Sequence, residues 1–370
     1  MKIAVLKETK PFEERVSCTP EISKKLISLG LKVGIESEAG SAASYSDSDY
    51  KSQGVEVSKS QKGFLDKADV IFAVRRPETK IAKLFKKNSI LICQMEPYQN
   101  QEEIKEFAKL GINSFALENV PRITRAQAMD VLSSQSNLSG YRAVIEASQI
   151  YGRAFPMMMT AAGTIPPARV LIMGAGVAGL QAVATAKRLG AIVSATDVRP
   201  AAKEQVESLG GKFVAVEDEE FREAETAGGY AKQMSKEYQK KQSKLISDTI
   251  KDQDIVITTA LIPGKPAPKL VSKEMITSMK PGSVVIDLAA VSGGNCELTK
   301  PDKIIKNNNV SIVGYTNIPS RLAGDASRLF ARNIFSFFEN IWDKENSKLN
   351  INQEDEIVKG SLLTYNGKLI

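Results

Sequence analysis

The sequence predicts an α/β protein with two doubly wound domains, mainly parallel sheets, and long linker helices between them. Short apolar runs of strand length alternate with amphipathic segments along most of the 370 residues. A glycine-rich turn follows one of these runs and opens a helix. Two long helical stretches, at residues 126–151 and 321–342, can connect the two halves.

The first 120 residues repeat strand and helix. Apolar runs lie at residues 3–6, 33–36, 70–74, 90–93 and 112–117, and amphipathic segments lie at 21–29, 78–85 and 102–110. This alternation is typical of a parallel sheet covered on both faces. This half contains no glycine-rich phosphate loop, so the sequence gives no sign that it binds a nucleotide of its own.

The linker helix is expected to run from Ala126 to Tyr151, with Thr124 and Gln127 forming a capping box before it. Gln127, Asp130 and Ser134 then share one helix face. That face either lines an interdomain cleft or is simply solvated, and composition favours neither. The next segment, residues 157–167 (MMMTAAGTIPP), is apolar and broken by prolines. We expect it to be an exposed hairpin or arm that packs on a partner subunit.

Residues 169–197 carry the main functional motif, an apolar strand followed by Gly174-Ala-Gly176-Val-Ala-Gly179, a helix, and a second strand. In a Rossmann-like domain, Gly174 makes the tight turn, Gly176 admits a pyrophosphate, and Gly179 lets helix pack on strand. The phosphates would rest on the helix N-terminus. Gly190 is expected to end the helix. Asp197 lies 18 residues after Gly179, close to the spacing of a ribose-binding acid.

The acid indicates NAD(H) rather than NADP(H), because its charge would repel a 2′-phosphate. Arg199 keeps the other reading open, since an arginine there can receive that phosphate. Two alternatives to a nucleotide site are a glycine-rich turn that binds nothing and a membrane span. The uncharged run at residues 170–186 is shorter than the about 20 residues that a span needs.

Beyond Asp197, a helix at 200–209 and a strand at 213–216 precede a charged insertion. Residues 217–225 are mostly acidic, Gly228-Gly229 breaks the chain, and residues 232–244 are polar and basic. We expect residues 217–234 to be a mobile lid, with an ordinary surface loop as the alternative. Further strands are predicted at 254–260, 283–287 and 311–314, and residues 356–370 read as a short strand or a tail. The expected domains are residues 1–125 plus 325–370, and 126–324.

Composition narrows the chemistry. The net charge of +7 is spread along the chain, and there is no aromatic-basic platform for nucleic acid. Three distant cysteines favour neither a disulfide framework nor a metal site, and no metal is expected. The start lacks a signal-peptide pattern, which favours the cytoplasm. The sequence has no histidine, so no imidazole can act as a general base or metal ligand.

Several stretches together resemble the proton-translocating NAD(P) transhydrogenase family, specifically its soluble NAD(H)-binding alpha component. They are KETKPFEERVSCTPE, PRITRAQAMDVLSSQSNLSGYRAVIEA, GAGVAGLQA, TDVRPAAKEQVESLGG, TAGGYAKQM, TALIPGKPAP and DLAAVSGGNCE. The resemblance covers nearly the whole chain. It implies a fold shared with alanine dehydrogenase.

The resemblance also implies site residues. The cluster beside the nicotinamide would be Arg122, Gln127, Asp130 and Ser133. The nucleotide contacts would be Ala175, Gly176, Val177, Asp197, Val198, Arg199, Gly229, Tyr230, Gln242 and Leu261. It further implies a homodimer with two membrane-spanning partner subunits, one carrying NADP(H). This chain would then lie on the cytoplasmic face of the inner membrane.

The residues are consistent with that chemistry, because direct hydride passage between two nicotinamides releases no proton. Only one dinucleotide motif is present, so the second nicotinamide would come from another chain. Alanine dehydrogenase is the nearest rival. Its relatives use a lysine and a histidine, whereas this chain has Arg75 at the lysine position, and arginine cannot serve as a base. A third reading is a nucleotide-sensing protein without turnover.

Overall fold

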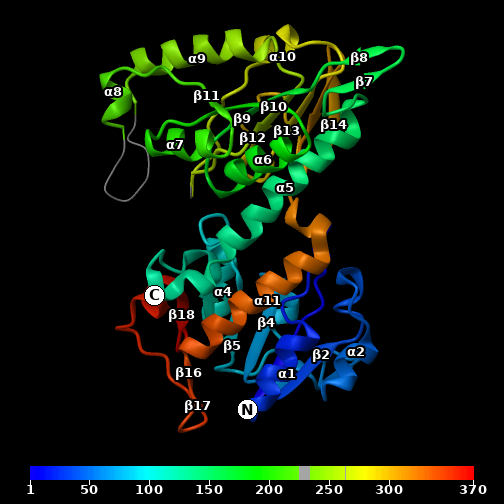
Figure 1. Cartoon of the computed structure of the whole chain (residues 1–370). Helices are drawn as coiled ribbons and strands as arrows, with labels where there is room; N and C mark the ends of the chain where they lie inside the picture. Colours follow the sequence, from blue (N-terminus) through cyan, green and yellow to red (C-terminus); the bar gives the residue numbers. More distant parts are fainter. Residues whose placement is uncertain (225–233, 263) are drawn as a thin grey trace. The chain divides into compact units, whose positions relative to one another are not determined.

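The computed structural model describes residues 1–224, 234–262 and 264–370. The chain forms two compact units, one made of Met1–Gln135 and Pro319–Ile370 and the other of Ser136–Ile318 (Figure 1). Each unit is built on its own mainly parallel sheet. The predicted α/β class with two doubly wound domains is confirmed.

The first unit has an eight-stranded sheet with the order β19-β18-β6-β5-β4-β1-β2-β3. Strands β1 to β6 are parallel. The C-terminal strands β18 and β19 add to one edge in antiparallel orientation, so the last residues belong to the sheet. The strands are β1 Lys2–Val5, β2 Lys32–Glu36, β3 Glu56–Ser58, β4 Val70–Arg75, β5 Ile90–Gln94, β6 Asn113–Ala116, β18 Leu362–Tyr365 and β19 Lys368–Leu369.

Both faces of this sheet are covered. Ile3 and its alternate neighbours along the strands join one apolar cluster, and Ala4 joins the other. Phe337 of the long helix α11 meets Phe115 of β6 edge to face, with ring centroids 5.2 Å apart. Phe107 of α4 lies in the opposite cluster. Burial on both sides explains why these strands read as continuous apolar runs.

The helices of the first unit connect and cover these strands. They are α1 Pro20–Ser28, η1 Ser41–Ala43, α2 Asp47–Ser52, η2 Leu65–Lys67, α3 Thr79–Ala82, α4 Gln101–Lys109, η3 Leu117–Asn119, η4 Thr124–Met129, η6 Pro319–Leu322, α11 Ala323–Asn340 and α12 Glu356–Ser361. A small hairpin, β16 Trp342–Asp343 and β17 Lys348–Leu349, follows α11.

The second unit has a seven-stranded sheet with the order β11-β10-β9-β12-β13-β15-β14. All its strands are parallel except β14. The order reverses between β9 and β12, which is where open α/β sheets bind ligands. The strands are β9 Arg169–Met173, β10 Ile192–Thr196, β11 Lys212–Phe213, β12 Ile255–Thr258, β13 Val284–Asp287, β14 Ile304–Asn307 and β15 Val310–Val313.

Helices also cover this second sheet, and an antiparallel hairpin precedes β9. The hairpin, β7 Met158–Thr160 with β8 Gly163–Ile165, lies within the segment for which the sequence predicts a hairpin or arm. The helices are α5 Val131–Tyr151, α6 Val177–Arg188, α7 Ala201–Ser208, α8 Glu219–Arg222, α9 Lys236–Ile250, α10 Lys273–Ser278 and η5 Ala290–Ser292.

The start of the linker helix differs from the prediction. Residues Thr124–Met129 form the 3₁₀ helix η4 without a side-chain cap, so the expected capping box of Thr124 and Gln127 is wrong. Asp130 is extended (φ −73°, ψ 91°), and α5 begins at Val131. The cause is the Asp130 carboxylate, which accepts the Ser133 N–H at 2.8 Å and thereby caps α5.

The two crossings between units lie at 135/136 and 318/319, whereas the sequence places the domain boundaries at 125/126 and 324/325. The difference has a physical source, because η4 and the first turn of α5 bond to α11 within the first unit. Asn333 of α11 donates to the Ala128 carbonyl at 2.8 Å and accepts from the Ser134 hydroxyl at 2.7 Å. Gln135 donates to the Ala326 carbonyl at 3.1 Å. The polar run at the start of the linker helix therefore makes structural bonds.

Candidate functional site

The glycine turn of the second unit, residues 174–179, joins β9 to α6 at the point where the strand order reverses. Gly174 has φ +104°, a conformation that favours glycine, and a Cβ there would lie 2.5 Å from the Thr259 hydroxyl. A Cβ on Gly179 would lie 1.8 Å from the Gly174 carbonyl oxygen. These two glycines therefore allow the turn and the close approach of α6.

Gly176 differs from both. It is the N-cap of α6 with φ −80°, and no described heavy atom lies within 4 Å of the position a Cβ would take. Among the described residues no side chain caps this helix. Open space above uncapped N–H groups, at the positive end of the helix dipole, suits an anion such as a pyrophosphate.

Asp197 lies at the end of β10 and is bonded directly to this turn. Its Oδ2 accepts the Ala175 N–H at 2.7 Å, and its side chain is 8 % exposed. The Arg199 guanidinium pairs with both carboxylate oxygens, at 2.9 and 3.0 Å, and also donates to the Ala175 carbonyl. Arg199 is thus directed at the acid that the sequence assigns to the ribose. Val198 between them is exposed.

Two further residues expected at the nucleotide lie on neighbouring elements of this sheet. Gln242 of α9 accepts the Val216 N–H and donates to the Thr196 hydroxyl, both at 2.9 Å, which ties α9 to the end of β10. Leu261 follows β12 and is 51 % exposed. Of the expected contacts, Ala175, Gly176, Val177, Asp197, Val198, Arg199, Gln242 and Leu261 all lie on elements at the carboxyl edge of β9, β10 and β12.

The expected lid is described only in part. Asp218 caps the short helix α8, and Ser235 caps α9 while donating its hydroxyl to Glu220 at 2.6 Å. Gly229 and Tyr230, the expected nucleotide contacts, lie outside the described residues, as do the rest of 225–233. Lid closure over a nucleotide therefore stays a prediction.

The linker cluster (Arg122, Gln127, Asp130 and Ser133) belongs to the first unit. Asp130 and Ser133 are in contact, because the Ser133 hydroxyl donates to Asp130 Oδ2 at 2.5 Å. Arg122 and Gln127 are exposed on and before η4. The glycine turn belongs to the second unit, so each group is described within its own unit.

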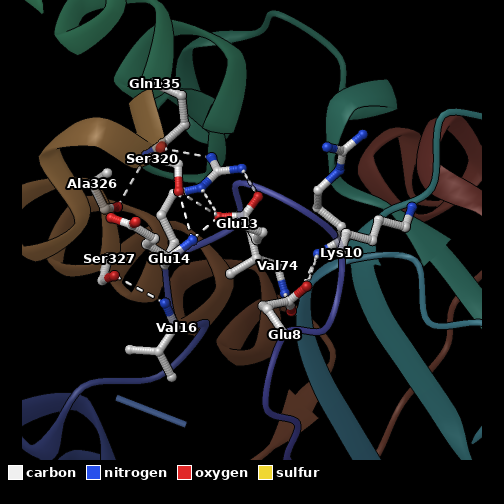
Figure 2. A network of polar contacts seen from close by, with 12 residues as sticks. Glu8, Lys10, Glu13, Glu14, Val16, Val74, Gln135, Ser320, Ala326 and Ser327 are labelled. Atoms are coloured by element: carbon white, nitrogen blue, oxygen red, sulfur yellow. Dashed lines mark hydrogen bonds and ion pairs between the residues drawn. The ribbon is translucent and has the colours of Figure 1, made fainter. Parts of the chain in front are cut away.

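A buried network that the sequence did not single out lies at the start of the first unit (Figure 2). Arg15 forms two bonds to Glu13, at 2.6 and 2.7 Å, and a third to Gln135 at 2.9 Å. The Glu14 N–H donates to the Ser320 hydroxyl at 2.6 Å, and the Val16 N–H donates to Ser327. The network therefore bonds one N-terminal loop to the stretches of the first unit that flank the two crossings. Arg15 and Gln135 lie 120 residues apart in sequence, so no local pattern could reveal their bond.

A second polar cluster lies at the carboxyl edge of the first sheet. The Glu8 carboxylate accepts the Val74 N–H at 2.6 Å (Figure 2). Burial, reinforced by the charge of Glu13, raises the pKa of Glu8 to about 8. Arg75 forms an ion pair with Glu96, and Lys10 lies 4.0 Å from the same carboxylate. The cation at position 75 is thus neutralised by an acid.

Two negative findings bear on the described part of the chain. None of its helices is long and apolar enough to cross a membrane. Its histidine, cysteine, aspartate and glutamate side chains nowhere form a group of three that could hold a metal ion.

The strand order, the glycine turn and the bonded acid define a dinucleotide-binding α/β protein of two Rossmann-like units. Two family models match, the alanine dehydrogenase/PNT N-terminal domain over residues 4–139 and its C-terminal domain over residues 143–370. The chain belongs to the alanine dehydrogenase/PNT family.

Relatives lie on the transhydrogenase side and on the alanine dehydrogenase side. The chain is 52 % identical to the first portion of NAD(P) transhydrogenase subunit alpha of Rhodospirillum rubrum, over 100 % of this chain and 98 % of that protein. A solved transhydrogenase from Sinorhizobium meliloti is 50 % identical over the full length of both chains, with a TM-score of 0.91. A solved L-alanine dehydrogenase matches over 100 % of this chain and 97 % of that one, with a TM-score of 0.84. At 23 % identity it shows the fold alone.

Proposed function

We propose that this chain is the NAD(H)-binding component of a proton-translocating transhydrogenase. It passes hydride between NADH and NADP⁺ bound on a partner subunit, coupled to proton movement across the membrane. The observation that carries the proposal is the glycine turn with Asp197 bonded to it, a site suited to one nucleotide without a 2′-phosphate. The names of the full-length relatives support the same assignment.

The nucleotide supplies the hydride chemistry, and the chain supplies binding, orientation and exclusion of water. In this assignment the α6 N-terminus and Gly176 hold the pyrophosphate, and Asp197 accepts hydrogen bonds from the ribose hydroxyls. No residue of this chain has to move a proton in the hydride step. That agrees with a sequence that contains no histidine.

The linker cluster is assigned to the nicotinamide end. Asp130 has a structural task as the cap of α5, which complicates a simple test of its catalytic role. Asparagine is as good an N-cap as aspartate, so Asp130→Asn keeps the cap and removes only the charge. Gln127→Asn shortens an exposed side chain by one methylene. We expect both variants to lose turnover while NADH affinity and unfolding temperature change little.

The test reconstitutes the purified chain with its NADP(H)-binding partner subunit. Hydride transfer from NADH is followed with an NADP⁺ analogue whose reduced form absorbs at a separate wavelength. Transfer should require both proteins and should fall in the two linker variants. Absence of transfer while both nucleotides bind would overturn the proposal, and would leave a nucleotide-sensing protein as the better reading.

The alanine dehydrogenase alternative receives a direct control. Arg75 stays charged and is paired with Glu96, so this position offers no base for amine chemistry. Alanine should therefore not drive NADH formation by the purified chain. Alanine-dependent NADH formation that is absent from a mock purification would restore that alternative.

The assembly is proposed as a homodimer bound to membrane-spanning partners, on the cytoplasmic face of the inner membrane. Support comes from the β7–β8 hairpin, where Met157 and Met159 are 60 % and 77 % exposed. Replacing both methionines by glutamine should shift the chain from dimer to monomer in light scattering. An unchanged mass would remove the hairpin from the dimer contact.

A further inference from the structure

The segment that follows β12 is bonded to the glycine turn on one side. The Thr259 N–H donates to the Met173 carbonyl at 2.9 Å, and its hydroxyl donates to the Gly174 carbonyl at 3.0 Å. Leu261, two residues further on, is exposed at the same edge of the sheet. The first residue after β12 thus moves with the turn, and the next residues need a separate anchor.

That anchor is the side chain of Asn295. Its Oδ1 accepts the Ala260 N–H at 3.0 Å, and its Nδ2 donates to the Ala260 carbonyl at 2.9 Å. The same Nδ2 donates to the Pro268 carbonyl at 2.8 Å. One amide therefore pairs with both backbone groups of Ala260, as the peptide of a neighbouring strand would. No other side chain as short as asparagine's offers both an acceptor and two donors.

Asn295 is itself held in place from two sides. Its carbonyl accepts the Leu270 and Val271 N–H groups at 2.8 and 3.1 Å. The adjacent Cys296 N–H donates to the buried Asp287 carboxylate at 2.9 Å. Asp287, the last residue of β13, also accepts from the Thr258 and Thr299 hydroxyls and from the Ala289 N–H. The loop that carries Asn295 is thus folded around one carboxylate.

The burial of Asn295 decides which role it can have. The residue is 0 % exposed, so it cannot contact a bound nucleotide. Leu261, by contrast, is exposed and is an expected nucleotide contact. Any effect of Asn295 on the nucleotide has to pass through the Ala260 backbone.

We propose that Asn295 is a positioning residue for NAD(H), which fixes the backbone of Ala260 and so holds Leu261 against the bound nucleotide. This inference rests on the proposed function. The physical basis is pre-organisation. A loop that is already ordered loses less conformational entropy when the nucleotide binds than one that has to become ordered.

The first test replaces Asn295 by aspartate, which has the same size. The variant keeps the acceptor for the Ala260 N–H but loses both donated bonds and sets a carboxylate against two carbonyls. We expect the dissociation constant for NADH to rise about tenfold, measured by calorimetric titration. Where the added charge prevents folding, the neutral Asn295→Ser is used, since a hydroxyl can replace at most one of the donated bonds.

Asn113→Asp is the matched control. Asn113 is 5 % exposed in the first unit, donates to the Asn88 carbonyl at 3.2 Å and accepts the Asn366 N–H at 2.9 Å. The substitution breaks the same kind of buried amide bond away from the glycine turn. It should lower the unfolding temperature and leave the dissociation constant for NADH unchanged.

A double-mutant cycle with Leu261→Ala shows whether the effect passes through Leu261. If it does, the double variant Asn295→Asp/Leu261→Ala weakens NADH binding by less than the product of the two single effects. If Leu261→Ala alone leaves NADH affinity unchanged, the nucleotide contact in the proposed function fails. If Leu261→Ala weakens binding and Asn295→Asp only lowers the unfolding temperature, the positioning role is overturned and the proposed function stands.

Discussion

Gly176→Ala separates nucleotide binding from folding at the glycine turn. Gly176 has φ −80° and ψ −164°, a conformation open to alanine, and no described atom lies within 4 Å of the new methyl group. Glycine is slightly better than alanine at an N-cap. Alanine instead lowers the entropy of the unfolded chain, by about 0.4–1 kcal/mol. These effects oppose each other, so the free energy of unfolding should change by less than about 1 kcal/mol.

The same methyl group would occupy the place assigned to the pyrophosphate and push it off the α6 N–H groups. We expect NADH affinity to fall between tenfold and a hundredfold, or about 1.4–2.8 kcal/mol. Calorimetric titration and urea unfolding measure the two quantities separately. Gly179→Ala is the contrasting variant, because its Cβ would lie 1.8 Å from the Gly174 oxygen and should cost about 3 kcal/mol or more of stability. Wild-type NADH affinity in Gly176→Ala would refute the placement of the pyrophosphate.

Three further substitutions test single interactions. Asp197→Ala should weaken NADH by roughly 30-fold, about 2 kcal/mol, and narrow its advantage over NADPH, because the ribose loses its acceptor; equal losses for both nucleotides would contradict this. Glu13→Gln should lower the free energy of unfolding by about 3–5 kcal/mol in urea, since Arg15 stays buried without its charged partner; a loss under about 1 kcal/mol would count against the pair. Glu8 has a pKa raised from 4.5 to about 8, so the folded state keeps a proton that the unfolded chain releases, and stability should fall as the pH rises between these values. Glu8→Gln should flatten that decline in unfolding curves at pH 5 and 8, and an unaltered decline would assign it to other groups.

Local signals were enough to predict the fold class and the glycine turn. A buried parallel strand is apolar along its whole length, and a turn against a pyrophosphate needs glycines at fixed offsets, so both leave a mark in consecutive residues. Gly190, with φ +86° just past α6, ends that helix as its position predicts.

The start of the linker helix shows where local signals were insufficient. The pairs Thr124 with Gln127 and Asp130 with Ser133 both have the spacing of a helix cap. The structure uses only the second, with Asn333 of α11 bonded to the Ala128 carbonyl between them. Two local solutions of similar quality were resolved by a contact that spans 205 residues of sequence.

Tertiary structure alone determined the tasks of the buried polar residues. Asn295 lies 35 residues from the Ala260 backbone that it holds, and Arg15 lies 120 residues from its partner Gln135. A buried polar group must find a hydrogen-bond partner, but its sequence neighbourhood does not say which one. By itself, the sequence determined where a nucleotide can bind, because that depends on the backbone of one short turn. The folded chain decided which distant side chains hold that turn and its neighbouring loops in place, because only the assembled sheets bring them within hydrogen-bond distance.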